Sequence, residues 1–223
     1  MPPPLLTLET HCHTIYSHDS LSRPEQLIHH CHTHGINRLC ITDHNTMRGA
    51  FVLARLAPDL VIPGEEILTT EGELLGYFMS EPIPPRLTPA ETIARLKAQN
   101  AVISVAHPFD PRRAHWSAES LHALAPHFDV IEIFNSRTLN PHHNDLARAF
   151  AADHHLPALV GSDAHTVAEV GHSRVQLPAF STADEFRAAL QSAILNPHRV
   201  PLHAIPGTLL AKVAKTLNPR LKP

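Results

Sequence analysis

The sequence predicts an α/β protein in which helices cover a parallel sheet that has enough strands to close into a barrel. Short apolar segments alternate with longer amphipathic ones, as in strand–helix–strand units. Side chains that can bind metals follow the predicted strands, where barrel proteins build their active sites. Hydrophobic residues make up 43% of the 223 residues and charged residues only 17%, which is enough apolar material for a sizeable core.

Length, charge and cysteine content narrow the class of protein. The length favours one domain over residues 1–223, and the net charge of −3 argues against a surface that coats nucleic acid. We expect no membrane span, because no apolar run is long enough, and no secretory leader precedes the first strand. The three cysteines are odd in number and lack C-x-x-C spacing, which predicts free thiols in a cytoplasmic protein.

The first half of the chain predicts three strands, two helices and a hairpin. A strand is expected over 5–11, and a helix over 24–34 begins at Pro24 and stops at Gly35. A strand over 38–42 and a helix over 47–56 follow. The strand over 60–62 leads into Pro-Gly-Glu-Glu at 63–66, and residues 69–79 predict a hairpin that turns at Glu71-Gly72.

The second half continues the alternation. Thr88 and Glu91 have the spacing of a capping box, which predicts a helix up to about residue 100. A second such pair, Thr182 and Glu185, predicts a later helix. We further expect strands over 101–106, 130–134, 158–160 and 175–177, helices over 117–124 and 142–154, and a basic amphipathic helix over 207–217.

The motif His11-Cys12-His13 ends the first predicted strand. Residues two apart on a strand point to the same side, so both imidazoles could bind one ion while Cys12 faces away. A chance pair is the alternative, because 20 residues of the chain are histidine. The wider pattern favours a site, since the metal-capable residues at or just past strand ends are His11, His13, His44, Glu66, His107, Asp163 and His165.

Six short motifs, taken in order, resemble those of the polymerase and histidinol phosphatase (PHP) family. They are HCHT at 11–14 with Asp19, ITDHN at 41–45, PGEEI at 63–67, AHP at 106–108, IEIFN at 131–135 and GSDAH at 161–165. The resemblance covers about residues 5–180 and leaves a C-terminal helical extension over about 181–223. It implies a single-domain, distorted (β/α)7 TIM-like barrel with two or three divalent metals at its mouth.

The resemblance also implies which residues hold the metals. His11, His13, Glu66 and Asp163 would bind the first ion, Glu66 and His107 the second, and Asp19, His44 and His165 the third. Glu65 is expected to point away, as a solvated or supporting group, and Asp43 to orient a histidine. Some relatives add a histidine to the second metal; the matching position here falls near Asn140, so His142 and His143 stay open as candidates.

The activity implied by the resemblance is phosphoester hydrolysis through a metal-activated hydroxide. Nitrogen and oxygen ligands without thiolate suit zinc, iron or manganese. Arg137 is our candidate for binding substrate phosphate, with a surface salt bridge as the alternative. Arg112, Arg113 and His115 could meet substrate or lie in a solvated loop.

Three functions remain open. The first is a phosphatase or phosphodiesterase that acts on a small phosphorylated metabolite or nucleotide. The second is an exonuclease or oligoribonuclease that trims short nucleic-acid ends, which would need a basic track such as Arg112, Arg113 and Arg137. The third is a non-catalytic, metal-stabilised binding module, which a near-complete ligand set argues against.

Overall fold

A nine-stranded mixed sheet forms the centre of the computed structural model, which describes residues 4–201, 206–218 and 221. Its strands run in the order β7-β6-β5-β4-β3-β2-β1-β8-β9. Their bounds are β1 (Leu5–Cys12), β2 (Arg38–Ile41), β3 (Val61–Leu68), β4 (Glu73–Tyr77), β5 (Val102–Val105), β6 (Val130–Asn135), β7 (Ala158–Gly161), β8 (Arg174–Pro178) and β9 (Ile194–Asn196).

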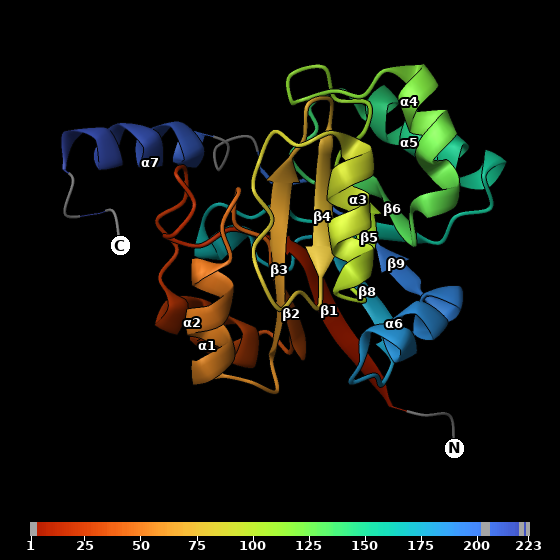
Figure 1. Ribbon diagram of the computed structural model, residues 1–223. Helices are drawn as coiled ribbons and strands as arrows, with labels where there is room; N and C mark the ends of the chain where they lie inside the picture. The colour runs from red at the N-terminus through yellow and green to blue at the C-terminus, as the bar shows by residue number, and fades with distance from the viewer. Residues whose placement is uncertain (1–3, 202–205, 219–220, 222–223) are drawn as a thin grey trace.

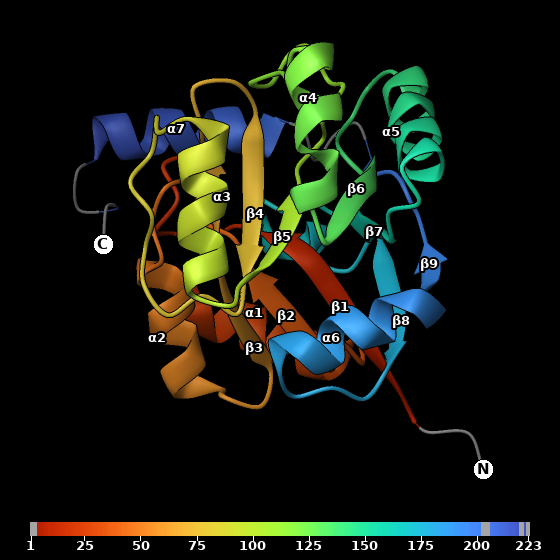
Figure 2. The same ribbon diagram turned by 45° about the vertical axis from the view of Figure 1, so that its right-hand side comes forward.

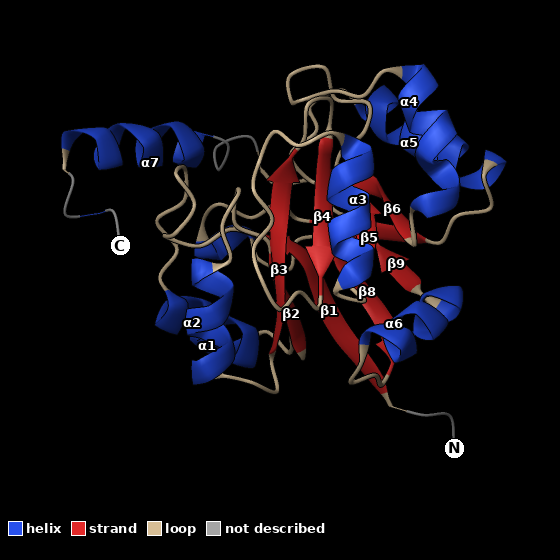
Figure 3. Ribbon diagram, in the orientation of Figure 1, coloured by secondary structure: helices blue, strands red, loops and turns tan. Residues whose placement is uncertain are grey.

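Helices surround this sheet on its outer side (Figures 1, 2 and 3). The predicted capping box is present, because Thr88 Oγ1 accepts from Glu91 N and the Glu91 carboxylate accepts from Thr88 N. No described helix has the length and apolarity needed to cross a membrane. The helices are α1 (Pro24–Thr33), α2 (Arg48–Leu56), α3 (Pro89–Ala98), α4 (Ala118–Leu124), α5 (Pro141–Asp153), α6 (Ala183–Ala189) and α7 (Pro206–Leu217).

The sheet is nearly closed and barrel-like, which confirms the predicted fold class. Strands β1, β2 and β3 are parallel, as are β5, β6 and β7, while β4 is antiparallel to both of its neighbours. The end of β7 returns to β1 through a bridge between Cys12 and Ala164, where His13 N donates to Ala164 O at 2.8 Å. The carboxyl ends of β1 and β7 therefore lie side by side.

Two elements differ from the sequence prediction. Strand β3 continues through Pro63 and Gly64 to Leu68. It can do so because residue 64 is a glycine: a Cβ there would lie only 2.4 Å from Gly76 O on β4, and glycine alone permits this close approach. Strand β9 was not predicted, so the segment 181–223 is not wholly helical. It is short, and its residues are partly or fully exposed, which leaves no alternating pattern in the sequence.

Two apolar clusters hold the strands in place. The larger one joins the strands to α3 and α6 through residues such as Leu96, Val102 and Phe186, and the smaller one joins β2 to α1 and α2 through Leu27 and Leu53. All three cysteines are buried free thiols, as predicted. None of the described residues of helix α7 belongs to either cluster, and the helix lies beside the loop after β1 (Figure 1).

Candidate metal centre

All eight predicted metal ligands meet at the mouth of the barrel. They come from five regions of the sequence, and nearly all are fully buried. His11 ends β1, His13 follows it and Asp19 lies in the next loop, whereas His44 follows β2, Glu66 lies within β3, His107 follows β5, and Asp163 and His165 follow β7.

The residues expected for the first metal converge on one point. His13 Nε2 lies 3.2 Å from Asp163 Oδ1 and 3.4 Å from Glu66 Oε2. His11 Nε2 lies 3.4 Å from Glu66 Oε2 and 3.6 Å from Asp163 Oδ1. Two ligands bonded to one ion at about 2.1 Å are separated by roughly 3 to 3.5 Å, so these spacings fit a shared ion.

The other two predicted groups flank the first. Glu66 Oε1 lies 3.0 Å from His107 Nε2, while Asp19 Oδ2 lies 3.5 Å from His44 Nε2 and 3.3 Å from His165 Nε2. Glu66 is fixed between strands, because its backbone N donates to Asp43 O and its backbone O accepts from Asn45 N. It therefore faces both the first and the second group.

Neighbouring groups orient the histidine rings. The Nδ1 atom of His11 lies 2.9 Å from Glu132 Oε1, that of His13 lies 3.2 Å from Ser17 Oγ, and that of His165 lies 2.8 Å from the backbone oxygen of Asp163. Each contact suits a ring that donates from Nδ1, which leaves Nε2 free to bind a metal.

The chemistry of the inward-facing atoms fits divalent metals. Buried polar atoms that lack a partner are costly, and proteins rarely retain them without a purpose. Nitrogen and carboxylate donors together suit zinc, iron or manganese. Among the described residues, the buried atoms without a hydrogen-bond partner include His11 Nε2, His13 Nε2, His165 Nε2, Asp19 Oδ1, Glu66 Oε2 and Asp163 Oδ1.

The electrostatics of the centre also favour cations. Burial acts to raise the pKa of the Asp163 carboxyl, but Arg113 and His11 outweigh it and hold that pKa well below its usual range. The pKa of Glu66 is likewise low despite burial, because of His44 and His11. Burial together with the neighbouring His165 and His44 lowers the pKa of His13, so its imidazole is neutral and able to coordinate.

Two predicted ligands have strained backbones. His107 has a φ of 27° and Asp163 a φ of 51°, values that non-glycine residues seldom adopt. The His107 backbone N–H donates to Glu132 Oε2 at 2.8 Å. Such conformations persist where surrounding contacts hold a residue in a functional position.

Some predicted residues lie elsewhere. Asn140 caps α5. His142 is exposed, and the Nδ1 atom of His143 lies 3.9 Å from Asp110 Oδ1. Among the described residues, neither histidine belongs to a metal-capable group. Glu65 is fully buried rather than solvated: it accepts from Ile83 N, and burial raises its pKa to about 7. The side of β3 that carries Glu65 is covered by the loop after β4, and the hydropathy pattern gave no sign of this cover.

Asp43 and Arg137 also have partners of their own. The Asp43 carboxylate accepts from Thr14 N at 2.6 Å and Thr14 Oγ1 at 2.7 Å, so it fixes the loop after β1 rather than a histidine ring. The buried Arg137 guanidinium bonds Glu169 and Thr208. Glu169 in turn accepts from His165 N at 2.9 Å, which links Arg137 to the loop after β7.

Several side chains at the centre were not predicted from the sequence as ligands or supports. Glu132 bridges His11 and the His107 backbone, Glu73 Oε2 lies 3.8 Å from His107 Nε2, Arg113 bonds Asp163 Oδ2, and Lys212 Nζ lies 3.7 Å from Asp19 Oδ2. A charged residue within an apolar strand indicates a buried functional role, so the position of Glu132 in the strand over 130–134 could have identified it from the sequence. Arg113 and Lys212 lie in a loop and a terminal helix, whose positions sequence patterns do not fix.

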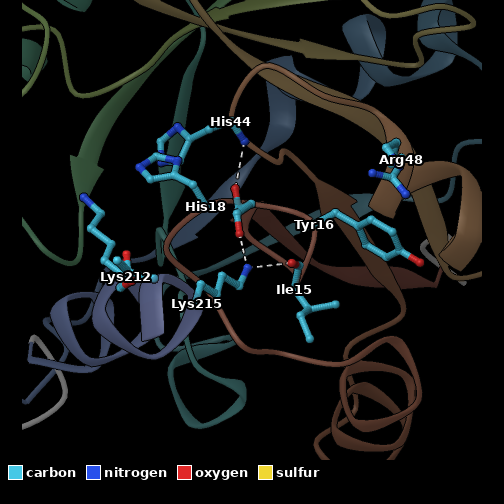
Figure 4. A pocket seen from close by; sticks show the side chains of 9 residues that line it. Ile15, Tyr16, His18, His44, Arg48, Lys212 and Lys215 are labelled. Atoms are coloured by element: carbon cyan, nitrogen blue, oxygen red, sulfur yellow. Dashed lines mark hydrogen bonds between the residues drawn. The ribbon is translucent and has the colours of Figure 1, made fainter. Parts of the chain in front are cut away.

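Two clefts open beside the centre. One has a volume of about 470 Å³ and includes Tyr16, His44 and Arg48 in its walls (Figure 4). In this cleft Lys215 of α7 donates to the backbone oxygens of Ile15 and Ser17, which ties α7 to the loop after β1 (Figure 4). The second cleft, about 290 Å³, is lined by Arg112, Arg113, Arg137, Thr208, Leu209 and Lys212.

Comparisons with known proteins agree with this geometry. The PHP domain matches residues 9–79, and the PHP-associated region matches residues 141–193. An uncharacterized protein of Methanocaldococcus jannaschii, MJ0417, is 33% identical over 175 residues, which are 77% of this chain and 70% of that protein. A second, MJ1587, is 37% identical over 116 residues, 46% of this chain and 68% of that protein.

Solved structures share the fold at low sequence identity. PsfC from Pseudomonas syringae has a TM-score of 0.68 and 17% identity, covering 97% of this chain and 99% of that one. A proposed metal-dependent phosphoesterase from Bifidobacterium adolescentis has a TM-score of 0.63 and 19% sequence identity, and the match covers 90% of this chain and 99% of that one. The lesion-specific endonuclease PfuEndoQ from Pyrococcus furiosus has a TM-score of 0.61 and 16% sequence identity, and the match covers 86% of this chain and 58% of that one.

Sequence and structure thus lead to the same family. The matched regions contain the motifs around His11, His44 and Glu66, and the structure brings these together with Asp163 and His165. The family and the cluster of His, Asp and Glu side chains indicate a metal-dependent hydrolase. The chain belongs to the PHP family.

Proposed function

We propose that the chain is a metal-dependent phosphoesterase that hydrolyses a small phosphorylated metabolite or nucleotide. The observation that carries this proposal is the convergence of buried imidazole and carboxylate atoms that lack other partners. Divalent ions bound there would lower the pKa of water and neutralise the oxygens of a phosphoester. The ligands we propose are His11, His13, Asp19, His44, Glu66, His107, Asp163 and His165.

Basic side chains beside these ligands would bind the phosphate. The Arg113 guanidinium reaches Asp163, and its side chain is 23% exposed, so it can contact both the centre and a ligand from solvent. Lys212 reaches Asp19 from α7 in the same way. Arg137 lies in the wall of the cleft that both residues line, and we retain it as a phosphate-binding candidate. A guanidinium can bind two phosphate oxygens at once.

The larger cleft would hold the organic part of the substrate. Its volume of about 470 Å³ lies in the range of small-molecule sites, and His44 joins it to the predicted third metal group. Inside it, the Arg48 guanidinium lies 5.3 Å from the centre of the Tyr16 ring. A mixed polar and aromatic wall of this kind supports a metabolite or nucleoside group.

The basic cleft gives some support to a second function, removal of nucleotides from short nucleic-acid ends. Arg112, Arg113, Arg137 and Lys212 line it together, as a basic track would require. Its small volume of about 290 Å³ favours one or two phosphate groups over a long strand.

Hydrolysis assays test the proposal directly. Protein reloaded with manganese, iron or zinc should hydrolyse at least one compound in a panel of phosphomonoesters, phosphodiesters, nucleoside bisphosphates and short oligonucleotides. Asp163→Ala should reduce this activity to background, because it removes a proposed ligand. Asp153→Ala is the matched control, since that side chain is exposed on α5. A reloaded protein that is inactive on the whole panel would contradict the proposal.

The same panel separates the two functions. A preference for monophosphates with little salt dependence favours the small-molecule enzyme. A preference for oligonucleotides that weakens steeply with salt favours the nuclease, because each phosphate contact releases counterions. Metal binding without any hydrolysis would instead point to the non-catalytic module.

A further inference from the structure

The predicted second metal group is short of ligands. Glu66 and His107 are the two side chains that the family motifs supply to it, and a divalent ion in a protein normally takes four or more ligands. The structure leaves Asn140 as a helix cap and His142 exposed, and it places His143 against Asp110. The loop after β6 therefore does not contribute a histidine here.

Sheet topology brings a different acid to this position. Because β4 runs antiparallel to β3 and β5, its first residue, Glu73, lies where the parallel strands end. Glu73 pairs with Leu68 at the end of β3, and its backbone O accepts from Ala106 N at 3.2 Å, directly before His107. The backbone on both sides thus fixes Glu73 at the barrel mouth.

The strand register sends the Glu73 side chain toward the centre. Directly opposite residues of an antiparallel pair share one face, so Leu68 and Glu73 share a face, as do Glu66 and Leu75. Residues 66 and 68 are two apart on β3 and point the same way. Glu66 and Glu73 consequently project from the same side of the hairpin.

Distances agree with this orientation. Glu73 Oε2 lies 3.8 Å from His107 Nε2, close to the separation expected for two ligands of one ion. Ligand atoms of His44, Glu66 and Glu73 all lie within 4.8 Å of one another. The Glu73 side chain is 12% exposed, so it is open to the mouth and able to adjust toward an ion.

We infer that Glu73 is a ligand of the second metal, in the place of the histidine that some relatives supply from the loop after β6. The inference rests on the proposed function, since it assigns a residue to the same centre. Its competitor is a purely electrostatic role, in which Glu73 balances the positive charge of Arg113 without touching an ion. The two roles differ in how many ions the chain binds when the Glu73 charge is removed.

The test counts bound ions in a variant and in a matched control. Apo protein is dialysed against manganese or cobalt(II), and elemental analysis with cobalt d–d absorption gives the ions bound per chain. Glu73→Gln should bind one ion fewer than wild type, and Glu73→His should restore the lost ion because imidazole is again a ligand. Glu71→Gln should bind as wild type does, since Glu71 turns to Ser117 and Ser120.

A crystal of the metal-loaded wild type makes the test independent of variant folding. Anomalous density should place an ion at about 2.0–2.2 Å from a Glu73 oxygen and within bonding distance of Glu66 and His107. An equal ion count in Glu73→Gln, or an ion at His107 that does not contact Glu73, would overturn the assignment while leaving the hydrolase intact. A wild type that takes up no metal would instead contradict the proposed function itself.

Discussion

At the scale of single residues, the centre depends on side chains that fix the histidines as much as on the histidines themselves. Glu132 contacts both the His11 ring and the His107 backbone, and its Oε2 also accepts from Asn135. Gly161 leaves room for this arrangement, because a Cβ there would lie 2.3 Å from Glu132 Oε1 and 2.7 Å from His11 Cβ. One carboxylate thereby sets the geometry of two proposed ligands.

The change Glu132→Gln tests this role. It keeps the shape of the side chain but weakens its contact with the His11 ring, so we expect metal affinity to fall about 10- to 100-fold. Competition with a chelating dye measures that affinity. Glu119→Gln, on the exposed side of α4, makes the same charge change elsewhere and should leave it unaltered. Equal affinities for the two variants would contradict the role of Glu132.

At the scale of elements, basic side chains hold α7 to the barrel, while its large apolar side chains stay exposed. Leu209, Leu210 and Leu217 are all more than half exposed, whereas the Lys215 side chain is buried and donates to two carbonyls of the loop after β1. That loop carries Ser17, which contacts the His13 ring and accepts from His44 N. The position of α7 is thus linked to the predicted third metal group.

Replacing Lys215 should release α7. Lys215→Met keeps the length of the side chain but removes its donors, so the two carbonyls lose those hydrogen bonds. Hydrogen exchange of the α7 amides should accelerate at least about tenfold, since each net hydrogen bond contributes about 1 kcal/mol. Lys212→Met, one turn earlier and half-exposed, should cause a much smaller change. Comparable exchange in both variants would show that Lys215 does not anchor the helix.

At the scale of the whole molecule, the barrel concentrates buried charge that a cation would neutralise. Asp19, Glu66 and Asp163 all have pKa values held low, so three carboxylates are ionised in a buried space, balanced in part by Arg113 and the histidines. Isolated buried charges are costly to a fold. Metal binding should therefore stabilise the native state as well as equip it for hydrolysis.

Thermal unfolding measures that stabilisation. At a free metal concentration 100 times the dissociation constant, one bound ion adds about 2.7 kcal/mol to the free energy of unfolding. The midpoint should rise when manganese or zinc is added to apo protein and fall again with a chelator. His13→Ala should show a smaller rise in the unfolding midpoint when metal is added. A wild-type protein whose midpoint does not change with added metal would contradict the account.

Much of this architecture follows from sequence patterns. Capping residues such as Thr88 and turn residues such as Gly35 predicted helix boundaries within two residues. Strand-end motifs, with Asp19 added by the family resemblance, identified the eight proposed ligands that meet at the mouth. These signals are local or depend on motif order. The hairpin predicted at Glu71-Gly72 is present, since β4 is antiparallel to β3. The burial of Glu65 and the reach of Arg113 depend instead on tertiary packing and loop paths, which local patterns do not encode.

The most direct test of the central claim is a joint titration of bound metal and phosphoester hydrolysis. As apo wild type is titrated with manganese, iron or zinc, hydrolysis should rise in step with the ions bound per chain, and His13→Ala should lose both. A purified protein that binds less than about one divalent ion per chain, and stays inactive after reloading with all three metals, would contradict the account.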